Sequence, residues 1–122
     1  MKNGFSIHSR IKSFKYAFNG LGILIRSQHN AWIHAAATIL VIITGIFVEL
    51  TLSEWRWIAF AVITVWMAEA FNTALEFLAD AAVKEKHPLI EKAKDVAAAA
   101  VLIAATGSVI IGILVIGPRL FQ

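Results

Sequence analysis

The sequence predicts an all-α membrane protein with an N-terminal amphipathic surface helix followed by three transmembrane helices. Of its 122 residues, 59% are hydrophobic and 16% are charged, which is too apolar for a soluble domain. Three windows reach the roughly 17 to 25 apolar residues that a spanning helix needs, namely 31–48, 55–78 and 96–117. We therefore expect one membrane domain over residues 1–122, and an oligomer, because so small a bundle has little interior.

The surface helix is expected over residues 6–25. Isoleucine, leucine and phenylalanine recur there at spacings near 3.6, opposed by Arg10, Lys12 and Lys15. Such a helix lies on the membrane with its cations among anionic headgroups; the alternative, a basic arm folded on a soluble partner, is weakened by the missing soluble core. Gly20 and Gly22 are expected to allow a bend before the first span.

The spans are connected by two short turns. Ser53 is the expected N-cap of the second helix, which should run from about residue 54 to about residue 85. That length is roughly 45 Å against a hydrocarbon core of about 30 Å, so its last turns should stand in water. Pro88 is expected to end this helix, with the third beginning near residue 89 or 90.

Basic residues indicate the orientation. They gather at the N-terminus and around the second loop, whereas the turn at residues 49–54 is acidic. Because Lys and Arg favour cytoplasmic loops, the N-terminus, the surface helix and the second loop are expected in the cytoplasm. The net charge of +3 is interpreted as topology, and no nucleic acid partner is expected.

Polar residues form a stripe on the second helix. Glu69, Asn72, Glu76 and Asp80 are separated by three, four and four residues, which places them on one helix face. A carboxylate at the centre of a membrane helix costs roughly 2.5 to 3.5 kcal/mol and usually marks a site for ions, protons or polar substrates. Hydrogen bonding between packed helices is the alternative, but one Asn or Thr would provide it at a gain of roughly 0.6 to 2 kcal/mol. A functional site is favoured.

More polar residues should gather at the cytoplasmic end of this stripe. Glu85 and His87 come from the second loop, and Lys94 and Asp95 from the start of the third helix. Such a set can hold a divalent cation, pair a lysine with a phosphate and keep a buried carboxylate as a base, which are the parts that phosphoryl transfer needs. ATP is the expected solute, and without a Gly-rich phosphate loop its binding would depend on side chains. His34, in the first span, is interpreted as a hydrogen-bond partner for a neighbouring helix.

The motif Glu69-Ala-Phe-Asn72-Thr-Ala-Leu-Glu76, followed by Asp80, Glu85-Lys-His87 and Ala93-Lys94-Asp95, resembles the small bacterial membrane diacylglycerol kinase family. That family includes undecaprenol kinases, and the resemblance covers nearly the whole chain. It implies a multi-pass protein of the bacterial inner membrane that transfers the γ-phosphate of ATP to the hydroxyl of diacylglycerol or undecaprenol. It also implies Mg²⁺ as cofactor and a homotrimer with shared active sites.

The resemblance assigns roles to individual residues. Glu69 would be the general base for the lipid hydroxyl, Asn72 would fix the phosphoryl geometry, and Glu76 would hold the magnesium. The residues implied in ATP binding are Arg10, Tyr16, Gln28, Glu76, Glu85, His87, Lys94 and Asp95.

One position departs from the family pattern. Many members carry a glutamate, as a second metal ligand beside the one matching Glu76, where this chain has Gln28. A glutamine carbonyl can ligate magnesium but brings no charge, so Gln28 and Glu76 together carry one negative charge fewer than the family's pair of glutamates.

Two other functions stay in view. A proton-coupled transporter would use Glu69 as carrier and would not need Glu85, His87, Lys94 or Asp95. A catalytically idle adaptor would explain Gln28 as early decay, but every other motif position is retained. No residue distinguishes diacylglycerol from undecaprenol as the substrate.

Overall fold

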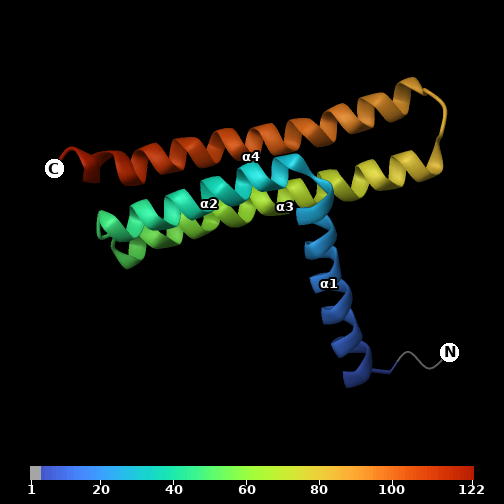
Figure 1. The fold of residues 1–122 in the computed structure, drawn as a ribbon, viewed down its shortest axis with the longest axis horizontal. Helices are drawn as coiled ribbons and strands as arrows, with labels where there is room; N and C mark the ends of the chain where they lie inside the picture. Colours follow the sequence, from blue (N-terminus) through green and yellow to red (C-terminus); the bar gives the residue numbers. More distant parts are fainter. Residues whose placement is uncertain (1–3) are drawn as a thin grey trace.

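The computed structural model describes residues 4–122, and these form four helices without any strand. The helices are α1 (Ile7–Ser27), α2 (His29–Phe47), α3 (Leu52–Ala82) and α4 (Pro88–Leu120). Figure 1 shows α2, α3 and α4 running alongside one another, while α1 leaves them at a steep angle. The all-α class is confirmed, and the last three helices are long and apolar enough to cross a membrane, as the three predicted spans require.

α1 begins where the hydroxyl of Ser6 accepts a hydrogen bond from the backbone N–H of Ser9, at 3.3 Å. The expected bend at Gly20 and Gly22 is wrong, because the helix continues through both glycines to Ser27. The chain turns instead at Gln28, whose φ of −122° and ψ of 121° are extended. A helix tolerates an isolated glycine at a cost of roughly 1 kcal/mol, so glycine alone does not end it. Its placement on a membrane surface remains a prediction.

The first turn of α3 is capped differently from the prediction. Thr51, and not Ser53, is the N-cap: its hydroxyl accepts from the N–H of Glu54, and the Glu54 carboxylate accepts from the N–H of Thr51. Two orphan donors are thus satisfied reciprocally, which Ser53 could not achieve with the residues that follow it. Nearby, the Trp55 ring packs directly on Gly45 of α2.

The second loop is longer than expected because α3 ends at Ala82 and not near residue 85. Pro88 begins α4, where its missing N–H is no loss and its fixed φ suits the first helical turn. With 31 and 33 residues, α3 and α4 are roughly 46 and 50 Å long, and both exceed a hydrocarbon core of about 30 Å. Their ends at this loop extend beyond α1 in Figure 1.

α3 and α4 are held together by small residues along their length and by ion pairs at both ends. The Ser108 hydroxyl donates to the Ala61 carbonyl at 3.0 Å, as expected where small side chains let helices approach. Arg119 pairs with Glu54 at one end, and Lys94 pairs with Asp80 at the other. α4 nevertheless has no buried residue, which leaves much apolar surface for lipid or for other subunits.

Candidate active site

The polar stripe of α3 passes from the interior of the bundle to water. Glu69 is 0% exposed and Asn72 is 6% exposed, whereas Glu76 is half-buried and Asp80 is exposed. A carboxylate withdrawn completely from solvent is expensive, so Glu69 requires a compensating partner or a function.

The partner of Glu69 is His34 of α2. The Nε2 atom of His34 lies 3.3 Å from Oε2 of Glu69, while the other carboxylate oxygen, Oε1, is buried without a hydrogen-bond partner among residues 4–122. The His34 ring stands edge-on to Trp66, with 6.2 Å between ring centroids. Trp66 in turn donates to the Thr38 hydroxyl at 3.1 Å. His34 therefore makes an interhelical hydrogen bond, as interpreted, but its partner is the residue expected to be the base.

A second cluster forms one to two turns further along α3. The Gln28 amide donates to Glu76 Oε2 at 3.4 Å, and the Asn72 amide donates to Glu76 Oε1 at 3.3 Å. The Asn72 carbonyl oxygen is buried and has no partner within residues 4–122. The break at Gln28 thus brings the junction of α1 and α2 onto the predicted site.

The oxygen atoms of this cluster are of the kind that could hold a magnesium ion. Mg²⁺ prefers oxygen ligands and is usually held by one or two carboxylates together with substrate phosphates. Glu76 supplies one carboxylate, and the unpartnered Asn72 carbonyl and the Gln28 carbonyl are amide oxygens beside it. Within residues 4–122 there is no group of three or more His, Cys, Asp or Glu that could hold a metal ion. A metal here would therefore depend on amide oxygens and on the phosphates of a nucleotide.

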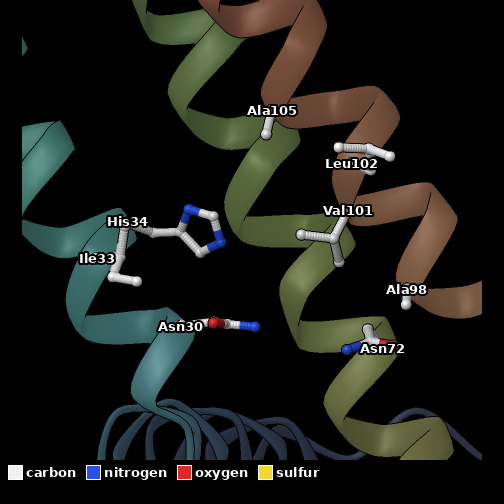
Figure 2. A pocket seen from close by; sticks show the side chains of 8 residues that line it. All are labelled: Asn30, Ile33, His34, Asn72, Ala98, Val101, Leu102 and Ala105. Atoms are coloured by element: carbon white, nitrogen blue, oxygen red, sulfur yellow. The ribbon is translucent and has the colours of Figure 1, made fainter.

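A cavity of about 280 Å³ lies between α2, α3 and α4 beside these clusters (Figure 2). Its polar lining comes from Asn30, His34 and Asn72, which project into the space between the helices. The remaining lining is apolar: Ile33, Ala98, Val101, Leu102 and Ala105. Sequence reasoning missed Asn30, although its spacing of four from His34 places both on one face of α2.

The other predicted residues lie toward water. Lys94 pairs with Asp80 at 2.7 Å, and His87 caps α4 by accepting from the N–H of Leu89 at 3.1 Å. Glu85 and Asp95 are exposed beside them. Arg10 and Tyr16 are exposed on α1, which leads away from the bundle in Figure 1. The single chain therefore brings Gln28, Asn72 and Glu76 together but forms no hydrogen bond from Arg10, Tyr16, Glu85 or Asp95 to the stripe.

Comparison with known proteins identifies the family. Residues 15–116 match the family described as prokaryotic diacylglycerol kinase. This chain belongs to that family. The chain is 40% identical over 109 residues to the undecaprenol kinase of Bacillus subtilis, and the match covers 89% of each protein. It is 37% identical over 101 residues to a diacylglycerol kinase of Synechocystis sp., covering 82% of this chain and 58% of that protein.

These matches confirm the resemblance and the enzyme class. The protein is a membrane-embedded lipid kinase of the diacylglycerol and undecaprenol kinase type. The transporter interpretation is not supported, since both relatives carry the names of kinases.

Proposed function

We propose that the protein transfers the terminal phosphate of ATP to the hydroxyl of a membrane lipid at the cytoplasmic interface, with Glu69 as the final acceptor of the hydroxyl proton. The observation that carries the proposal is the buried Glu69 carboxylate, which lies one helical turn from Asn72 and two from Glu76 and whose Oε1 atom has no hydrogen-bond partner among residues 4–122. A base held out of water beside a phosphate-binding cluster is the arrangement that attack by an alcohol on a phosphoryl group requires.

Gln28 and Glu76 are the proposed metal ligands, with the buried Asn72 carbonyl beside them. Bound Mg²⁺ supplies charge neutralisation for the phosphates of the nucleotide. For Gln28 to act as a ligand, its amide must turn so that the carbonyl oxygen and not the NH₂ faces Glu76. Asn72 would then fix the position of the phosphoryl group by its own amide.

The nucleotide is proposed to lie at the end of the stripe that reaches water. Lys94 would exchange its exposed partner Asp80 for a phosphate, since the pair is accessible to solvent on both sides. Glu85, His87 and Asp95 surround this end of α3 and α4, and Arg10 and Tyr16 of α1 would complete the site from the surface helix. The basic residues near this end support a cytoplasmic orientation.

Undecaprenol is the lipid that we propose as substrate. The relative matched over 89% of its own length is an undecaprenol kinase, whereas the match to the diacylglycerol kinase covers 58% of that protein. An apolar groove of about 360 Å³ begins at His34 and continues between α2, α3 and α4 to Gly112. It would receive part of a hydrocarbon chain while the hydroxyl stays near Glu69.

A homotrimer with shared active sites is proposed as the assembly. Its support is the apolar surface that the chain leaves uncovered, above all on α4, where no residue is buried. Residues of α1 that reach no partner in their own chain would then contribute to a site in a neighbouring subunit.

The test is ATP turnover by the purified protein in mixed micelles that contain either undecaprenol or diacylglycerol. We expect phosphorylation of undecaprenol, and a loss of about 100-fold or more in Glu69→Gln, since removal of a general base usually has at least this effect. Glu49→Gln is the matched control, because Glu49 lies in the turn at the opposite end of α3. Turnover of diacylglycerol alone would reject the substrate, and full activity of Glu69→Gln would reject the base.

A further inference from the structure

His34 stands between the cavity and the buried carboxylate. It lines both the 280 Å³ cavity and the apolar groove, whereas Glu69 lines neither of them and is 0% exposed. A hydroxyl bound in the cavity therefore meets the imidazole before it meets the carboxylate. We propose that His34 relays the proton of the lipid hydroxyl to Glu69.

The hydrogen bonds of His34 suit a relay. With Glu69 ionised, the Nε2 atom carries the proton and donates to Oε2 at 3.3 Å, which leaves Nδ1 as an acceptor. No residue among 4–122 makes a hydrogen bond to this Nδ1 atom, so it is available to a substrate. Trp66 holds the ring edge-on, and the Thr38 hydroxyl, which accepts from Trp66, donates to the His34 carbonyl at 2.7 Å.

Within residues 4–122, no side chain that lines the cavity other than His34 can carry the proton. Asn30, Asn72 and the apolar residues of α4 that line the cavity have no side chain that gains or loses a proton near neutral pH. His34 is the one titratable residue among those that line the cavity. A proton leaving the cavity toward Glu69 thus has the imidazole as its path.

The proposed step passes one proton through His34. The lipid O–H bond breaks and its proton joins Nδ1 of His34, while the Nε2 proton of His34 passes to Oε2 of Glu69. The lipid oxygen forms a bond to the γ-phosphorus of ATP. The bond from that phosphorus to the bridging oxygen breaks, and ADP leaves with the electron pair. His34 stays neutral overall, and Glu69 holds the proton until product release.

This inference rests on the proposed function, and the test separates the two. His34→Gln keeps an N–H donor for Glu69 but cannot accept a proton and release another. We expect it to lower kcat for the lipid about 100-fold, with KM for ATP and lipid within about twofold of the wild type. His29→Gln is the matched control, since His29 is exposed at the start of α2, and it should retain activity.

A second variant distinguishes a relay from a structural role. His34→Ala leaves a space the size of the imidazole, so added imidazole should restore its kcat at least about tenfold while leaving Glu69→Gln unchanged. Gel filtration in detergent checks that each variant elutes as the wild type does. If His34→Ala does not elute as the wild type does, the kcat of His34→Gln alone tests the relay.

Two results would overturn the relay: activity of His34→Gln within about threefold of the wild type, or a folded His34→Ala that imidazole does not restore. In either case, loss of activity in Glu69→Gln would leave the kinase proposal intact. Absence of turnover in the wild type with both lipids would instead reject the proposed function, and the relay with it.

Discussion

At the scale of single residues, two amides surround the one carboxylate at the proposed metal site, and one of them, Gln28, stands where many family members carry a glutamate. Gln28 and Asn72 each donate to one oxygen of Glu76, so its carboxylate is satisfied without a metal. A cation that binds Glu76 must displace at least one of these two amide donors. The Glu76 carboxylate is then the one negative charge in this cluster that compensates the charge of the cation. Metal affinity is therefore the property that Gln28 should limit.

Gln28→Glu is expected to raise the affinity for Mg²⁺ by about tenfold, because a second carboxylate adds charge to the oxygen ligands. In the metal-free protein the same change sets two carboxylates about 3.4 Å apart and should lower the unfolding midpoint. Binding of Mn²⁺ as a spectroscopic probe, measured without lipid and with a non-hydrolysable ATP analogue in place of ATP, gives the affinity. Gln122→Glu, the same change at the exposed C-terminus, is the control. Equal affinity in wild type and Gln28→Glu would remove Gln28 from the metal site.

Only part of this site could be predicted from the sequence. Spacing along one helix placed Glu69, Asn72 and Glu76 together, since neighbours at three and four residues share a face. The contact of Gln28 with Glu76 spans 48 residues, and only the resemblance pointed to it. The contact of His34 with Glu69 depends on which faces of α2 and α3 meet. Residue spacing within one helix does not determine which faces of two helices meet.

At the scale of helices, apolar length predicted the spans, but the ends depended on individual caps. Ser53 and Thr51 are both able caps, and Thr51 prevails because Glu54 stands three residues after it and completes the reciprocal pair. Gly20 and Gly22 do not bend α1, because the cost of a glycine is small compared with the stability of a continuous ladder of backbone hydrogen bonds. At the second loop, Pro88 starts a helix and does not merely stop one.

Gly45→Ala is expected to destabilise the contact between α2 and α3. A Cβ atom at this position would lie 2.5 Å from Cη2 of the Trp55 ring and 3.0 Å from Cδ1 of Leu50. Overpacking of this kind costs about 1 to 3 kcal/mol. Unfolding in mixed detergent micelles, followed by loss of helical signal, measures the effect.

Gly107→Ala is the matched control for Gly45→Ala. Within residues 4–122 nothing lies within 4 Å of a Cβ atom at Gly107, so alanine there should be neutral or stabilising by up to about 1 kcal/mol. Equal stability of Gly45→Ala and the wild type would contradict the packing of Trp55 on Gly45.

At the scale of the whole molecule, the arrangement of the helices indicates how the site meets its two substrates. α1 crosses the direction of the other helices, as a helix on the membrane surface would cross the spanning ones (Figure 1). The ends of α3 and α4 at the second loop would then extend into the water on that side. Lipid would reach His34, the hydrogen-bond partner of Glu69, from the apolar groove, and ATP would reach Glu76 from the extended ends.

Lipid phosphorylation is expected at the Lys-rich end of the bundle, where the loop between α3 and α4 lies. The most direct measurement supplies labelled ATP, which does not cross the bilayer, to sealed vesicles that contain undecaprenol and the protein in one known orientation. Labelled lipid is expected only when the loop between α3 and α4 faces the ATP, and none is expected with Glu69→Gln. Labelling from the side of the Glu49 turn, or labelling that persists in Glu69→Gln, would contradict this expectation.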